Sequence, residues 1–137
     1  MSVSIPNYTT ERPHTAKHPL AILHAAAESL AINTNDNVRG SVLILNPGGE
    51  NLFRYTFYLV APSLNDFRDP LFYAWHGVQP YPIHLMESGG RQGHDDKSYS
   101  SPEAFERALT TIFESSSARQ HIYSLLDAVE QALPNAA

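Results

Sequence analysis

The stretch from residue 71 to 86, LFYAWHGVQPYPIHLM, limits the possible folds of this chain more than any other segment. Two runs rich in aromatic and aliphatic residues flank the turn sequence GVQP, which predicts a β-hairpin. Side chains alternate between the faces of a strand, so Tyr73 and Trp75 share one face while Phe72 and Ala74 share the other. Neither face is polar. The hairpin is therefore covered on both faces, or one face stays apolar for a partner.

The simplest register of this hairpin makes two further predictions. A four-residue turn places Tyr73 opposite His84. His76 and His84 then point to opposite faces, so one metal ion cannot bind both. Pro82 has no N–H to donate to a neighbouring strand, which predicts an edge strand for residues 81–86.

The composition bounds the class of protein. The chain has 137 residues, the size of one domain, and 42% of them are hydrophobic, which is enough for a core. No apolar run approaches the roughly 18 residues of a membrane helix, and residues 1–14 lack the apolar segment of a secretory signal. The absence of cysteine excludes disulfides, cysteine-based zinc sites and thiol catalysis. These features predict a cytoplasmic protein with no membrane partner.

The charged residues argue against nucleic-acid binding. The chain has 14 acidic and nine basic residues and a net charge of −5. Its Lys and Arg residues are spread singly along the sequence, whereas a protein that follows a phosphate backbone gathers them. We therefore expect no nucleic-acid partner. An acidic body of this kind suits the masking of a partner protein, in particular a basic one.

The segments before residue 101 predict an arm, a helix and two hairpins. Residues 1–17 are polar and contain two prolines, which predicts an extended or mobile arm outside a single domain of residues 18–137. Pro19 marks the first helix, because apolar residues recur after it at helical spacing. The runs SVLIL and LFRYTFYLV around the turn sequence NPGGEN predict a hairpin over residues 41–60. Residues 87–100 are polar and without periodicity, which predicts a flexible loop.

The last third of the chain predicts two helices. Ser101 and Pro102 form a helix start, and an apolar stripe that includes Leu109 follows them. Three serines at residues 115–117 separate it from a second stripe, which predicts a helical hairpin. The element order is then α-β-β-β-β-α-α. We predict an α+β fold, a two-layer sandwich in which helices cover a four-stranded antiparallel sheet made of two hairpins.

The histidines and carboxylates form no recognisable catalytic or metal-binding pattern. His94, Asp95 and Asp96 stand together in the glycine-rich loop but lack the spacing of a calcium site, so a solvated loop is the preferred interpretation. No G-x-S-x-G motif is present, and no spacing selects a pair of carboxylates for glycoside hydrolysis. We therefore expect no catalytic residue, no metal and no cofactor, which disfavours an enzyme.

Aromatic side chains are the strongest functional signal in the sequence. Tyr58, Tyr73 and Trp75 fall on the sheet face opposite the predicted core, and His84 falls on the same face of the next strand. Tyr and Trp are enriched in the hot spots of protein interfaces. We therefore predict a non-enzymatic protein-interaction module that binds through these four residues. An inhibitor, an immunity protein or an adaptor fits this class, and the face associates with another protein or with a second copy.

A second hypothesis belongs to a different functional class. His76 or His84, together with a tyrosine, could serve a small-ligand-binding protein or a hydrolase in a cleft between the sheet and the C-terminal helices. Cavity geometry separates the two hypotheses. A deep pocket with convergent polar groups favours the ligand site, whereas a filled core beneath a flat aromatic face favours the interaction module.

Overall fold

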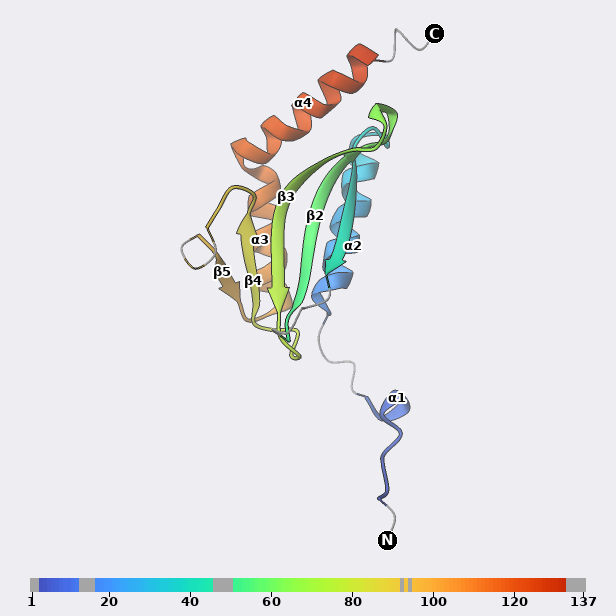
Figure 1. The fold of residues 1–137 in the computed structure, drawn as a ribbon, viewed down its shortest axis with the longest axis vertical. Coiled ribbons are helices and arrows are strands. Elements are labelled where there is room, and N and C mark those ends of the chain that lie inside the picture. Colours follow the sequence, from blue (N-terminus) through green and yellow to red (C-terminus); the bar gives the residue numbers. More distant parts are fainter. Residues whose placement is uncertain (1–2, 13–16, 46–50, 92, 94, 133–137) are drawn as a thin grey trace.

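The computed structural model describes residues 3–12, 17–45, 51–91, 93 and 95–132 of the 137-residue chain. Its elements follow one another as helices, then strands, then helices, with one 3₁₀ turn between the second and third strands (Figure 1). In order they are α1 (Tyr8–Glu11), α2 (Pro19–Asn33), β1 (Arg39–Leu45), β2 (Phe53–Ala61), η1 (Pro62–Leu64), β3 (Phe67–His76), β4 (Ile83–Glu87), β5 (Lys97–Tyr99), α3 (Pro102–Glu114) and α4 (Ser116–Ala132).

The sheet has five strands rather than the predicted four. All neighbours are antiparallel and the spatial order is β1-β2-β3-β4-β5, which confirms the α+β class and corrects the strand count. The added strand β5 lies within the predicted loop of residues 87–100. Three residues are too few to show the alternation by which a strand is recognised. Because β5 pairs with β4, the strand after Pro82 is not the edge strand that we predicted.

The helices cover one face of the sheet. Figure 1 shows α2 and α3 behind the sheet, and buried residues of α2, β2, β3, β4, α3 and α4 form one apolar core. A single residue, Ser115, joins α3 to α4. Helical hairpins need loops of about two to five residues. Accordingly α4 leaves α3 at a wide angle and extends past the end of the sheet, instead of folding back along α3 as we predicted (Figure 1).

Local signals explain where the two main covering helices begin. The N-cap of α2 is His18, whose Nδ1 accepts a hydrogen bond from the Leu20 amide at 3.1 Å, and Pro19 follows in the first helical position. The N-cap of α3 is Ser101, whose Oγ accepts from the Ala104 amide at 3.1 Å. Both predicted helix starts are confirmed. None of the described helices has both the length and the apolar character needed to cross a lipid bilayer.

A β-bulge interrupts the pairing of β2 with β3. Phe57 lies opposite Phe72, but Tyr58 lies opposite Pro70, so Leu71 is the extra residue. Leu71 is buried in the core, whereas continuous alternation predicts it on the opposite face. The bulge also accommodates proline within a central strand, because it interrupts the ladder there. As a result β3 begins at Phe67 and is longer than predicted.

The β3–β4 hairpin has the predicted faces but a different register. Trp75, not Tyr73, lies opposite His84, so the register differs by two residues and the loop is longer. The Tyr81 hydroxyl donates a hydrogen bond of 2.6 Å to the Lys17 carbonyl, which holds Tyr81 out of the strand. A shift of two residues leaves the side chains of residues 72–76 and 83–86 on their predicted faces, because the period of a strand is two.

Candidate interaction surface

The face of the sheet that points away from α2 and α3 has no described helix over it (Figure 1). We call it the open sheet face. The cross-strand pairs align its side chains in four rows. It comprises Arg39, Ser41, Leu43 and Leu45 of β1, Arg54, Thr56, Tyr58 and Val60 of β2, Arg68, Pro70, Tyr73 and Trp75 of β3, His84 and Met86 of β4, and Ser98 of β5.

The four residues predicted as a binding site all lie on the open sheet face. Trp75 and His84 are cross-strand partners and stack nearly parallel, with ring centroids 5.5 Å apart and an interplanar angle of 8°. Tyr73 occupies the neighbouring row, and Tyr58 lies on the adjacent strand β2. All four are half-buried. Each therefore presents an aromatic ring or imidazole to solvent while its base is held by strand neighbours.

Large side chains form a continuous layer over the open sheet face. Thr56 is only 4% exposed, although no described helix lies above it. Its cross-strand partners are Leu43 and Tyr73, and these larger side chains close over it. Leu43 and Leu45 of the edge strand remain 39% and 44% exposed. Apolar side chains thus contribute much of the surface at the centre and edge of the open sheet face.

The charge of the open sheet face differs in sign from that of the whole molecule. Arg54 lies beside Trp75, and the Arg68 guanidinium carbon lies 5.9 Å from the centre of the Tyr58 ring, a cation–π geometry. Arg39, at the edge, pairs with Asp36 of the preceding loop at 3.9 Å. Among the strand residues that the structure places on this face, none is Asp or Glu. A chain with a net charge of −5 thus presents a cationic aromatic face.

His76 is a core residue on the other side of the sheet. It is 2% exposed, its Nε2 lies 2.8 Å from the Tyr55 hydroxyl, and its Nδ1 lies 2.7 Å from the Gly77 carbonyl oxygen. The carbonyl can only accept, so Nδ1 carries a proton and donates to it. The His18 ring meets His76 edge-on at 5.4 Å. Both ring nitrogens of His76 are therefore used inside the fold, and His76 and His84 diverge as predicted.

The loop after β4 uses its carboxylates to hold its own backbone. Asp95 Oδ2 accepts a hydrogen bond from the Arg91 amide at 2.7 Å, and Asp96 Oδ1 accepts one from the Gly93 amide at 2.6 Å. These contacts explain the two aspartates as turn residues. His94 lies outside the described residues. Within the described part of the chain, no three His, Asp or Glu residues are grouped so that they could hold a metal ion.

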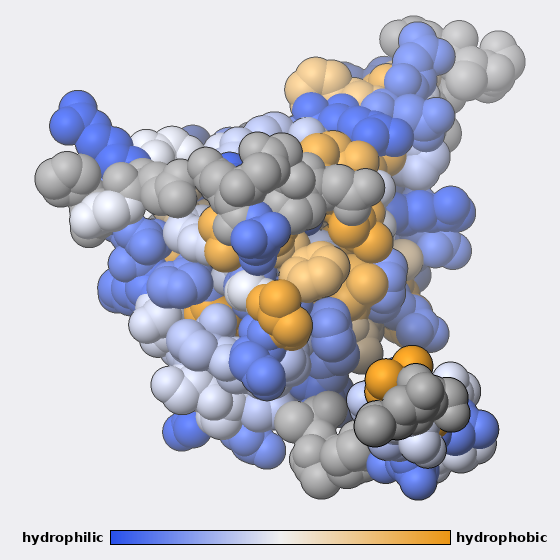
Figure 2. Space-filling model, turned by 60° about the horizontal axis from the view of Figure 1, so that its bottom comes forward, coloured by the Kyte–Doolittle hydropathy of each residue, from blue (hydrophilic) through white to orange (hydrophobic). Residues whose placement is uncertain are grey.

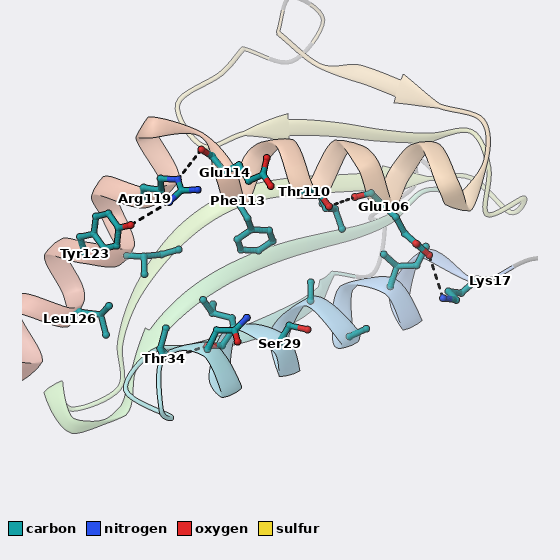
Figure 3. A pocket seen from close by; sticks show the side chains of 17 residues that line it. Lys17, Ser29, Thr34, Glu106, Thr110, Phe113, Glu114, Arg119, Tyr123 and Leu126 are labelled. Carbon is teal, nitrogen blue, oxygen red and sulfur yellow. Dashed lines mark hydrogen bonds and ion pairs between the residues drawn. The ribbon is translucent and has the colours of Figure 1, made fainter.

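A groove of about 700 Å³ separates α2 from α3 and α4 on the helix side of the sheet (Figure 3). Phe113 projects into it from α3. Pairs of polar groups stand near its ends, Lys17 with Glu106 and Arg119 with Tyr123. Its lining contains no histidine. The second hypothesis expected a cleft between the sheet and the C-terminal helices with His76 or His84 in it. The observed groove instead involves α2, and its width depends on the spacing of helices that are far apart in sequence.

Apolar side chains also gather at the end of the sheet where β1 and β3 finish. Figure 2 looks onto this end and shows hydrophobic side chains in the middle of the view with hydrophilic ones around them. Ile44 is 48% exposed, Phe53 43% and Val78 81%. Phe53 stacks on His76 with ring centroids 5.3 Å apart. The apolar surface of the sheet therefore continues around this end from the open sheet face.

Comparisons with protein-family models, with curated proteins and with solved structures found no match to this chain.

Proposed function

We propose that this protein is a non-enzymatic interaction module that binds a short acidic segment of another protein on its open sheet face. The observation that carries the proposal is the composition of that face, which combines aromatic rings and arginines and has no Asp or Glu among the strand residues placed on it. An inhibitor, an immunity protein or an adaptor works by covering part of a partner, and such a function needs a surface rather than a catalytic pocket.

The side chains of the face are those that contribute most at protein interfaces. Trp, Tyr and Arg are over-represented among hot-spot residues, and the largest losses on truncation occur near the centre of an interface. Trp75 lies between Arg54 and His84 in one row of the open sheet face. Its ring is already fixed by stacking on His84, so binding orders few additional side-chain rotamers. These features support Trp75 as the anchor of the interface.

Charge argues for the acidic character of the partner. Two copies that met through this face would bring Arg68 of both chains together, and none of the strand residues on the face is Asp or Glu. A nucleic acid requires a continuous cationic track for its phosphates, and the remainder of this acidic protein repels those phosphates. A short segment with carboxylates beside apolar side chains satisfies the arginines locally and fills the surface between the aromatic rings.

The test begins with a displayed library of random peptides, selected on the intact protein. We expect the selected peptides to be enriched in Asp or Glu next to apolar residues. Trp75→Ala should weaken the binding of such a peptide by about 2 kcal/mol, which is about thirtyfold in Kd, measured by isothermal titration calorimetry. Arg68→Glu should weaken it as well, because the substitution places a carboxylate on the face.

The control is Phe67→Ala, which removes an aromatic side chain that is 54% exposed but lies off the open sheet face. It should leave peptide affinity unchanged. Urea denaturation of each variant separates binding from folding, and Trp75→Ala should change the free energy of unfolding far less than it changes the affinity. Selection of Lys- or Arg-rich peptides, Trp75-dependent binding of single-stranded oligonucleotides, or unfolding of Trp75→Ala would each contradict the proposal.

A further inference from the structure

The groove between α2 and the C-terminal helices has apolar side chains on both of its walls. Its wall on α2 uses small side chains, Ala25, Ala26 and Ser29, which leave room beside the helix. On the other wall the half-buried Phe113 stands edge-on to Phe57 and Phe72 of the sheet, so its ring separates the buried aromatic core from the groove. The remaining apolar lining residues are Ile22, Leu30, Leu109, Ile122 and Leu126.

The N-terminal arm carries apolar side chains that are largely exposed to solvent. Val3 is 85% exposed, Ile5 71% and Tyr8 69%. The arm is not shapeless, because Asn7 caps the single turn of α1 through a 3.4 Å hydrogen bond from the Thr10 amide to its side chain. Figure 1 shows the arm projecting away from the domain beyond the N-terminus of α2.

The domain end of the arm is fixed at one mouth of the groove. Lys17 Nζ forms an ion pair with Glu106 of α3 at 3.3 Å, and the Lys17 carbonyl accepts the hydrogen bond of the Tyr81 hydroxyl. Lys17 is itself a lining residue of the groove. An arm that folded back into its own groove would pass over the Lys17–Glu106 pair and remove it from water, which is costly for an ion pair.

We propose that the apolar arm residues Val3, Ile5 and Tyr8 of one copy fill the groove of a second copy, so that the protein forms a dimer by reciprocal exchange of arms. Exchange of a terminal segment between identical chains is a low-cost route to a dimer. In this dimer the exposed apolar residues of the arm pack against the apolar lining of the partner's groove, so both are removed from water.

Charge is compatible with this exchange. Residues 3–12 of the arm hold Glu11 and Arg12, which sum to zero. The charged residues of the groove are Lys17, Glu106, Glu114 and Arg119, which also sum to zero. Neither surface therefore repels the other. The groove and the open sheet face lie on opposite sides of the sheet, so arm exchange leaves the face free (Figures 1 and 3).

Analytical ultracentrifugation of the full chain tests the proposal. The wild type should sediment as a dimer. Ile5→Asp, which places a charge on the arm, and Ser29→Trp, which fills the groove from α2, should each reduce the mass to that of a monomer. The matched controls are Thr9→Asp, on the arm, and His24→Trp, which is on α2 but does not line the groove. Both controls should remain dimeric.

Mixing the two disrupted variants provides the decisive measurement. The Ser29→Trp chain keeps an intact arm and the Ile5→Asp chain keeps an intact groove. Their mixture should form a heterodimer with one arm–groove contact, which dissociates more readily than the wild-type dimer. A monomeric wild type, or a dimer that both substitutions leave intact, would overturn the proposal. Neither result bears on peptide binding by Trp75, so the two proposals fail separately.

Discussion

At the residue scale, the closest approach between the layers occurs at a glycine. Gly40 of β1 faces α2, and a Cβ atom at this position would lie 2.5 Å from the Phe57 ring and 2.8 Å from Ala27. Those distances are shorter than any side-chain contact allows, so the absence of a side chain sets how near α2 can come to the sheet. The sequence around Gly40 resembles an ordinary strand start and does not reveal this requirement.

Gly40→Ala should therefore destabilise the fold. We expect a loss of about 1–3 kcal/mol in the free energy of unfolding, because the ring of Phe57 or the helix backbone must move to admit the methyl group. Urea denaturation measures this loss. Gly77→Ala is the control, since a Cβ atom at Gly77 meets nothing within 4 Å. Equal stability of the two variants would contradict the close packing of α2 on β1.

At the element scale, helix ends depend on a few neighbouring residues, and one of these ends is sensitive to pH. His18 caps α2 by accepting a hydrogen bond at Nδ1, which a protonated imidazole cannot do. Burial lowers the pKa of His18 below its ordinary value of 6.5, and the neighbouring His76 lowers the pKa further. The folded state therefore binds a proton at His18 less readily than the unfolded state does.

This difference predicts a loss of stability in acid. The contribution of His18 is complete above pH 6.5 and disappears as the pH falls through its lower folded-state pKa. His18→Asn keeps a capping side chain but removes the titration, so its free energy of unfolding should fall less than that of the wild type between pH 7 and pH 5. His24→Asn, an exposed change on the same helix, is the control. Parallel pH profiles of wild type and His18→Asn would refute the role of the cap.

At the scale of the whole molecule, two layers share one apolar core. Phe105, Leu109 and Ile112 of α3 are buried against the sheet, as the helical spacing predicts. The same layer arrangement leaves the opposite face of the sheet to solvent and opens the groove beside α2. The candidate binding surface and the groove thus follow from one cause, because the helices cover a single face of the sheet and cover it incompletely.

Leu109→Ala measures how strongly the layers depend on each other. Leu109 is 4% exposed, and its truncation should cost about 2–5 kcal/mol, seen as a lower midpoint of urea denaturation. Thr110→Ala alters the next residue, which is exposed, and should change stability by well under 1 kcal/mol. A near-zero loss for Leu109→Ala would mean that α3 does not contribute to the core.

The sequence alone determined the features that depend on near neighbours. Pro19 and Ser101 mark helix starts because capping is a matter of adjacent residues. The faces of Tyr58, Tyr73, Trp75 and His84 were predictable because alternation has a period of two, and the error of two residues in the hairpin register did not change them.

Only the tertiary structure decided the features that depend on distant contacts. The strand β5 forms because its three residues pair with the edge of β4. The bulge at Leu71 buries a residue that regular alternation assigns to the other face of the sheet. Arg68 lies on the open sheet face because β3 begins at Phe67, before the first residue of the strand that we predicted from the sequence. The charge of the open sheet face and the width of the groove both depend on segments that are far apart in the chain. No local pattern in the sequence therefore predicts them.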